Sequence, residues 1–293
     1  EAQWSPYYLD TDLTVASDGT LTLRDGVLLR IADGVGIDVK GSLDVAEATM
    51  QGPGAGARWT GLLVDGDVET DVTLRGARVL EASPAFRHHG AGHVQMTSTT
   101  LARSSGADPL IEVLPGASGA LDLVDVTLRD AGGACMRAQG PNLELTVNGL
   151  LFDGCGDEAA WWRNLDVVAS NLTVGAGSGA GVHLYGVRGS VDGVNASMHD
   201  GAGASMHVQD IDDDFRLTDL TLVAGQGTAA FTGGPNRGLD VDGVHITGAP
   251  GLDVDDSAGA LQNLVLEGPG TGTAFIAHHG RSSSLVVDGL AIS

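Results

Sequence analysis

A six-residue phrase recurs eleven times along the chain and constrains the fold more than any other feature. Each copy reads apolar, any residue, turn residue, apolar, any residue, apolar. The fourth position, here called the anchor, falls at Ala48, Ala77, Thr99, Val126, Leu150, Leu172, Val194, Leu220, Val244, Leu264 and Leu290. Anchors are separated by 20 to 29 residues, about 24 on average. A fixed phrase at a variable spacing is typical of a solenoid, in which each repeat contacts only its neighbours.

The apolar positions of the phrase predict a shared core. Every copy has an apolar residue three positions before the anchor and another two positions after it, as Val241 and Ile246 flank Val244. A regular strand would bury every second residue, so burial at these three positions requires a one-residue slip of phase. The slip falls on the residue just before the anchor.

The slip residue is Gly, Asn or Asp in nine copies, and Glu47 and Ser98 are the exceptions. These residue types tolerate a left-handed backbone, which a sharp bend between two strands requires. A further strand follows each Gly-rich loop, for example at residues 182–185 and 252–255. Three strands in each coil predict a parallel β-helix, and the many corners account for 45 Gly among 293 residues.

The chain resembles the right-handed parallel β-helix proteins of the pectate-lyase-like superfamily, especially the β-helix repeats of secreted archaeal and bacterial surface proteins. The resemblance rests on the repeats and on the opening stretch, with Trp4, Pro6, Tyr7, Leu13-Thr14-Val15, Gly19-Thr20-Leu21, Ile37-Asp38-Val39 and Trp59-Thr60-Gly61. It implies an all-β fold that hosts lyases, hydrolases, adhesins and inert spacers alike, so it identifies a scaffold rather than an activity.

The repeat predicts one continuous domain. Residues 1–42 are expected to form the N-terminal cap and first coils, and residues 43–293 the regular coils. No apolar run is long enough to cross a bilayer. The net charge of −23 argues against nucleic acid as a partner, because the phosphate backbone would be repelled.

Two sets of residues are candidates for covalent modification. Cys135 and Cys155 lie 20 residues apart, about one coil, and either form a disulfide between neighbouring coils or are two small buried apolar side chains. The disulfide is favoured, since both cysteines fall in expected corner loops. Asn171 and Asn195 begin N-glycosylation sequons, and Asn195 is the better candidate because Asn171 already occupies a bend.

The outer face of the third strand is richest in side chains that could bind a ligand. The candidates on this face are Arg137, Trp162, Arg163, His183, Tyr185 and His207. Alternation along the strands is expected to direct Arg137, His183, Tyr185 and His207 outward. Trp162 and Tyr185 would offer rings for stacking on sugars, and the Arg and His residues a positive strip for an anionic polysaccharide. The competing interpretation is that solvent-facing strands simply need polar residues. No catalytic residues are assigned.

An acidic loop is the only candidate for a metal site. Asp210, Asp212, Asp213 and Asp214 place four carboxylates together, which would suit calcium. The loop lacks the glycine spacing of known calcium loops, so a solvated acidic corner is the competing interpretation. No other cofactor is expected, and zinc is disfavoured because the histidines are single or adjacent in the sequence.

These features together predict an extracellular or cell-surface β-solenoid with a structural or adhesive role. The alternative is a polysaccharide-binding or polysaccharide-degrading β-helix protein that uses the outer face. No capping segment follows Ile292, so the last coil is expected to be open. Either the chain is a fragment of a longer surface protein, or this end docks on the N-terminal segment of a second copy. Such head-to-tail contacts would make a filament.

Overall fold

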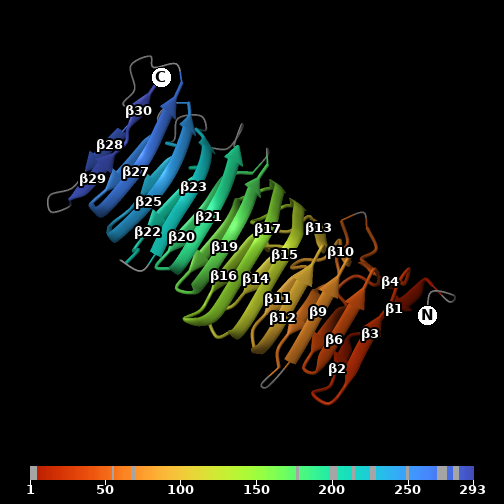
Figure 1. Ribbon diagram of the computed structural model, residues 1–293. Coiled ribbons are helices and arrows are strands. Elements are labelled where there is room, and N and C mark those ends of the chain that lie inside the picture. Colours follow the sequence, from red (N-terminus) through yellow and green to blue (C-terminus); the bar gives the residue numbers. More distant parts are fainter. Residues whose placement is uncertain are drawn as a thin grey trace.

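The computed structural model describes residues 5–54, 56–66, 70–175, 178–197, 203–212, 215–224, 229–248, 251–268, 276–279 and 284–293. Figure 1 shows a rod of stacked coils, with the N-terminus at one end and the C-terminus at the other. The described residues form strands in two parallel sheets, which confirms the predicted all-β solenoid. Among these residues, no helix is long and apolar enough to span a bilayer.

The larger sheet, sheet A, has 18 strands and contains the recurring phrase. Its strands are β1 (Tyr7–Leu9), β3 (Thr20–Leu23), β4 (Leu28–Ile31), β6 (Ser42–Ala46), β7 (Thr49–Gln51), β9 (Thr70–Arg75), β10 (Arg78–Leu80), β12 (Ala91–Thr97), β13 (Thr100–Ser104), β15 (Ser118–Ala131), β17 (Asn142–Cys155), β19 (Asp166–Val174), β21 (Arg188–Ser197), β23 (Phe215–Val223), β25 (Asn236–Thr247), β27 (Ser257–Glu267), β29 (Leu285–Asp288) and β30 (Ala291–Ile292). In each sheet A strand from β15 to β27, one continuous strand runs through the bend. The two strands that the sequence predicted on either side of the bend are therefore a single strand.

The smaller sheet, sheet B, has 12 strands and supplies the predicted third strand of each coil. Its strands are β2 (Leu13–Val15), β5 (Gly36–Val39), β8 (Gly61–Val64), β11 (Phe86–His88), β14 (Ile111–Val113), β16 (Met136–Gln139), β18 (Glu158–Arg163), β20 (Ala180–Tyr185), β22 (Met206–Gln209), β24 (Phe231–Gly233), β26 (Leu252–Asp255) and β28 (Ile276–His279). Each strand pairs in parallel with the strand of the next coil, so one position of a strand forms a continuous column along the rod.

The residue before each anchor has a left-handed backbone in all eleven copies. The φ angle there is positive at Glu47, Gly76, Ser98, Asp125, Gly149, Asn171, Gly193, Asp219, Gly243, Asn263 and Gly289. The bend does not break the ladder, because its N–H still donates to the next coil, as from Ser98 to the carbonyl of Val124 at 2.9 Å. Even the two exceptions in sequence, Glu47 and Ser98, adopt this conformation, with φ of 48° and 49°.

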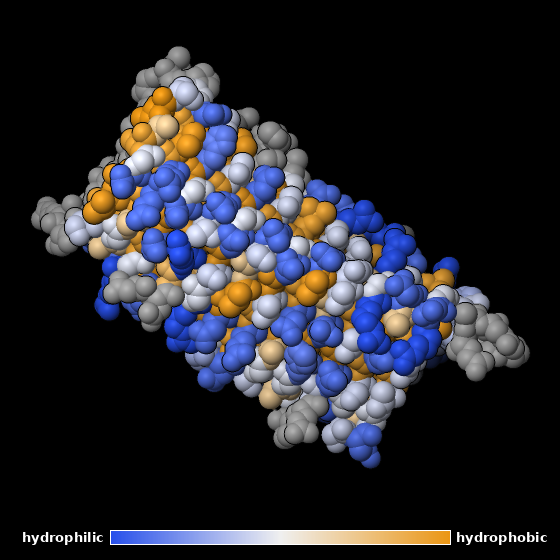
Figure 2. Space-filling model, viewed as in Figure 1, coloured by the Kyte–Doolittle hydropathy of each residue, from blue (hydrophilic) through white to orange (hydrophobic). Residues whose placement is uncertain are grey.

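The predicted apolar columns form the core of the rod, except in the last coil. In the first ten copies the anchor and both flanking positions are buried. In the eleventh, Val287 is 38% exposed, Leu290 44% and Ile292 57%. No strand among the described residues pairs with the outer edges of β29 and β30, so nothing there covers these side chains. Figure 2 shows hydrophobic surface gathered at this end of the rod.

The bend at Ser98 gives a test of the left-handed backbone. We expect Ser98→Gly to raise the free energy of unfolding by about 0.5–1 kcal/mol, since Gly adopts positive φ without steric cost. Ser98→Val should lower it by about 1–2 kcal/mol, because a β-branched side chain is strained there. Urea denaturation of both variants measures these changes.

The matched control is Thr97→Gly, one residue earlier on β12, where positive φ is not found. Glycine at that position should destabilise by about 0.5–1 kcal/mol. Equal losses from glycine at positions 97 and 98 would contradict the special role of the bend.

Candidate functional site

One column of outward side chains on sheet B contains the charged, imidazole and aromatic groups around which the candidate site is built. Successive strands place in register Arg87 (β11), Glu112 (β14), Arg137 (β16), Trp161 (β18), His183 (β20), His207 (β22) and Thr232 (β24). Each of these residues lies between buried neighbours, because alternation along a strand sends every second side chain into the core. Groups that are 22 to 25 residues apart in sequence thereby become neighbours in space.

Four rings from three of these strands form a contiguous group, which we call the aromatic cluster: Trp161, His183, Tyr185 and His207. The ring centres of Trp161 and Tyr185 are 5.8 Å apart, and those of Tyr185 and His207 5.3 Å. His183 is 5.5 Å from His207 and 6.3 Å from Tyr185. The cluster is half-buried, so one side of these rings is open to solvent.

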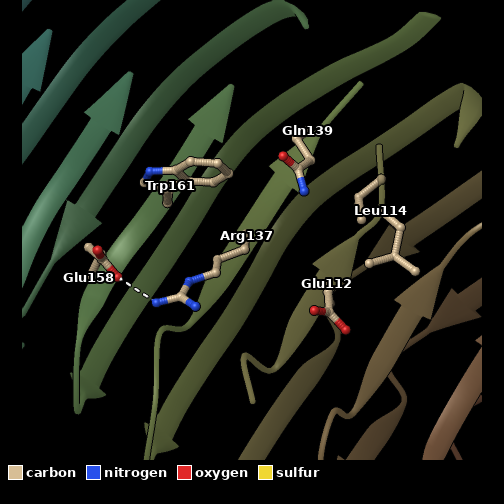
Figure 3. A pocket seen from close by; sticks show the side chains of 7 residues that line it. Glu112, Leu114, Arg137, Gln139, Glu158 and Trp161 are labelled. Atoms are coloured by element: carbon tan, nitrogen blue, oxygen red, sulfur yellow. Dashed lines mark hydrogen bonds and ion pairs between the residues drawn. The ribbon is translucent and has the colours of Figure 1, made fainter. Parts of the chain in front are cut away.

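A hollow of about 280 Å³ lies beside the cluster and shares Trp161 with it. Its other lining residues are Glu112, Val113, Leu114, Arg137, Gln139 and Glu158 (Figure 3). Arg137 occupies the middle and bonds two carboxylates through one nitrogen, at 2.8 Å to Asp157 and 3.1 Å to Glu158. The hollow therefore combines an indole face, an amide and a guanidinium–carboxylate network.

The two carboxylates beside Arg137 have pKa values that are shifted in opposite directions. Burial, and then the neighbouring Glu158 carboxylate, raise the pKa of Asp157. Burial also works to raise the pKa of Glu158, but hydrogen bonds from the backbone and from Arg137 outweigh it, and the pKa falls overall. Hydrogen bonding to Arg137 and to the backbone thus favours the charged form of Glu158, whereas burial and Glu158 disfavour that of Asp157.

The cluster itself is uncharged at neutral pH. Burial, reinforced by the nearby His207, lowers the pKa of His183 to about 4. Burial also lowers the pKa of His207, and burial together with Glu158 raises the pKa of the Tyr185 phenol. Both imidazoles are therefore neutral and the phenol is protonated near pH 7.

The positive strip expected from the sequence is not present. Arg137 is ion-paired to two carboxylates, Arg87 is paired to Glu112 at 2.5 Å, and the two imidazoles are neutral. The sequence correctly predicted that Arg137, His183 and His207 face outward, but the carboxylates that pair with Arg137 and Arg87 come from neighbouring coils. Of the expected cations, only Arg163 is exposed, with its guanidinium 6.0 Å from the centre of the Trp161 ring.

The prediction that Trp162 faces outward is wrong. Trp162 is fully buried in register with Ala138 and Leu184, and Trp161 takes the outward place between Arg137 and His183. Arg137, His183, Tyr185 and His207 do lie on the outer face as the alternation predicted. Alternation within β18 does not choose between two adjacent aromatic residues; the register of β18 with β16 and β20 places Trp161 outward.

The acidic loop is described only in part, and calcium binding there stays a prediction. Asp210 and Asp212 line a second hollow with Asn236, Arg237 and Asp256, whereas Asp213 and Asp214 lie outside the described residues. The described part of the chain contains no group of three or more His, Cys, Asp or Glu side chains placed to hold a metal.

Cys135 and Cys155 are joined by a disulfide that links neighbouring coils and is buried. Asn171 and Asn195, the sequon residues, are both exposed. Asn171 lies at a bend with φ of 56°, and its amide donates to Asn148 at 2.9 Å. Glycosylation of either residue stays a prediction.

Comparison with known proteins finds similarity only to solved structures of low sequence identity. No protein-family model and no curated protein sequence matches the chain. Among solved structures, it is similar to the Dettilon tailspike protein, with 12% identity and a TM-score of 0.42 over 96% of this chain and 61% of the tailspike chain. It is also similar to the A-module of the Azotobacter vinelandii mannuronan C-5 epimerase AlgE4, with 13% identity and a TM-score of 0.41 over 98% and 88% of the two chains.

A third similar structure is the Streptococcus pneumoniae surface protein and adhesin PfbA, with 11% identity and a TM-score of 0.29 over 100% of this chain and 93% of that one. The strand pairing shows that this chain is itself a solenoid of parallel coils. The chain is a parallel β-helix. The chain spans about three fifths of the length of the tailspike chain.

The two adjacent tryptophans test the phase of β18. Trp162→Ala should lower the free energy of unfolding by about 3–5 kcal/mol, because it leaves a large cavity in the core. Trp161→Ala removes a half-exposed ring and should cost less than about 1.5 kcal/mol. Thermal and urea unfolding of the two variants measure the difference, and equal losses would contradict the orientation described here.

Proposed function

We propose that this β-helix is an extracellular structural and adhesive module that binds a neutral polysaccharide along the outer face of sheet B. The observation that carries the proposal is the aromatic cluster, with its rings half-open to solvent next to a hollow lined by Arg137, Gln139 and Glu158. Apolar ring faces with a few polar groups beside them are the usual composition of a small-molecule site.

The geometry suits a sugar chain that lies along the rod. Trp161 and Tyr185 offer ring faces on neighbouring coils, and the C–H face of a sugar packs on such rings. In the adjoining hollow, the Gln139 amide can donate or accept hydrogen bonds with sugar hydroxyl groups, and the Glu158 carboxylate can accept them. Successive coils could therefore contact successive sugar units.

The charge of the face favours a neutral glycan over a uronate polymer. Arg137 and Arg87 are already paired with carboxylates, and the two histidines are neutral at pH 7. The chain as a whole carries a net charge of −23. A polyanion would meet repulsion from this body without a free cationic strip to offset it.

The proposed location outside the cell is supported by the disulfide between Cys135 and Cys155. Such bonds persist in oxidising compartments and are rare in a reducing cytosol. Acidic surface charge also keeps a β-rich rod soluble and discourages association with nucleic acid.

Glycan binding is tested on an array of neutral and uronate polysaccharides, followed by calorimetry on the strongest neutral ligand. Trp161→Ala and Tyr185→Ala should each weaken binding about tenfold or more, since each removes a stacking platform. Tyr8→Ala is the control, because Tyr8 is an exposed ring on β1, away from this face.

Two results would redirect the proposal. Binding that is unchanged in both cluster variants, or that is restricted to uronates, would contradict the neutral-glycan site. Shortening of the polymer during incubation, with new reducing ends or unsaturated products, would support the alternative of a polysaccharide-degrading enzyme.

We also propose that copies of the chain stack end to end through the exposed apolar side chains of β29 and β30. Val287, Leu290 and Ile292 occupy columns that are buried in every other coil, yet they are exposed here. A second copy could continue the columns by placing its first coil, with β1 and β2, against β29 and β30. This contact joins two different surfaces, so it does not close and produces a filament.

Sedimentation velocity over a range of protein and salt concentrations tests the stacking. The weight-average mass should rise with concentration, and Leu290→Asp should abolish the rise because it places a charge in the contact. Val168→Asp is the matched control, an exposed apolar residue on the side of the rod. A monodisperse protein at every concentration would contradict the proposal.

A further inference from the structure

Two histidines that are distant in sequence lie side by side on sheet B. His183 and His207 are register partners on β20 and β22, with ring centres 5.5 Å apart and planes inclined at 65°. They belong to consecutive coils, so their approach is fixed by the hydrogen-bond ladder between the strands. This pairing is not visible as a spacing motif in the sequence.

The ring nitrogens of the two histidines differ in their hydrogen-bond partners. The Nε2 atom of His183 is buried and has no hydrogen-bond partner among the residues that the structure describes, which is costly for a polar atom. The Nδ1 atom of His207 lies 2.8 Å from the Thr232 hydroxyl oxygen. When Nδ1–H donates to Thr232, Nε2 is the nitrogen of His207 that can bind an ion, as in histidines that bind metals through one nitrogen and are oriented through the other. An ion there competes with the Gln209 side chain, which also hydrogen-bonds this ring.

The spacing of the rings matches a shared ion. Two imidazoles that bind one ion through nitrogens about 2.1 Å away have ring centres roughly 5–6 Å apart. We propose that His183 and His207 together bind one divalent transition-metal ion of the kind that prefers imidazole, Cu²⁺ most strongly and Ni²⁺ or Zn²⁺ after it. The order follows from the general affinity of nitrogen ligands for these ions.

The surroundings set the strength and selectivity of this site. Within the described residues, no third His, Cys, Asp or Glu completes a metal-binding group, so water fills the remaining positions. Two protein ligands imply a dissociation constant on the order of micromolar rather than nanomolar. Calcium is disfavoured here because it prefers oxygen ligands, which separates this site from the acidic loop at Asp210 and Asp212.

The site is tested by titrating the tag-free protein with Cu²⁺ at neutral pH, with about 1 mM Ca²⁺ present to occupy the acidic surface. Quenching of tryptophan fluorescence reports binding near Trp161, and calorimetry gives the stoichiometry. We expect one copper ion per chain, with binding weakened about tenfold or more in His183→Ala and in His207→Ala. His93→Ala should bind as the parent does, because His93 lies on β12 of sheet A, paired with Asp122.

Electron paramagnetic resonance of the copper-loaded parent protein provides a readout that needs no variant. The spectrum should show two equivalent imidazole nitrogens, and one in either single variant. The proposal is overturned by a spectrum with oxygen ligands only, by affinity that is unchanged in both variants, or by no binding at about 100 µM Cu²⁺. Glycan binding by the metal-free protein is measured in parallel, so each proposal can fail alone.

Discussion

The whole rod depends on one backbone constraint, the left-handed residue before each anchor. There the strand changes phase by one residue, which sends the anchor and both its apolar neighbours into the core. The N–H of that residue still bonds to the next coil, so the turn is made without losing a ladder hydrogen bond. Gly, Asn and Asp meet this requirement most easily, and Glu47 and Ser98 show that neighbouring coils can impose it on other residues.

The same regularity builds the candidate site. Because the coils stay in register, the outward positions of sheet B fall into one column, and Trp161, His183 and His207 become neighbours although each belongs to a different coil. Burial between packed rings keeps the imidazoles neutral, and carboxylates on adjoining coils pair with Arg137. The face is therefore aromatic and nearly uncharged on a strongly acidic body, which is the basis of the neutral-glycan proposal.

The sequence predicted the solenoid, the bends and the core columns well, because each depends on residues that recur at fixed offsets. It was wrong at Trp162, where two adjacent aromatic residues left the phase open and only the register with Ala138 and Leu184 decides it. It also missed the pairing of His183 with His207 and the carboxylates around Arg137, since variable coil lengths hide which residues become neighbours. Contacts between coils are set by the loop lengths, which the repeated phrase does not contain.

The most direct test of the account is an experimental structure of the chain soaked with the neutral oligosaccharide that it binds most strongly. The account predicts positive φ at the bend residues, Trp162 in the core, and a sugar ring stacked on Trp161 and Tyr185 beside the Arg137 hollow. A sugar bound to sheet A or to an end of the rod, with the cluster empty, would contradict it. So would a structure in which Trp161 is buried and Trp162 faces solvent.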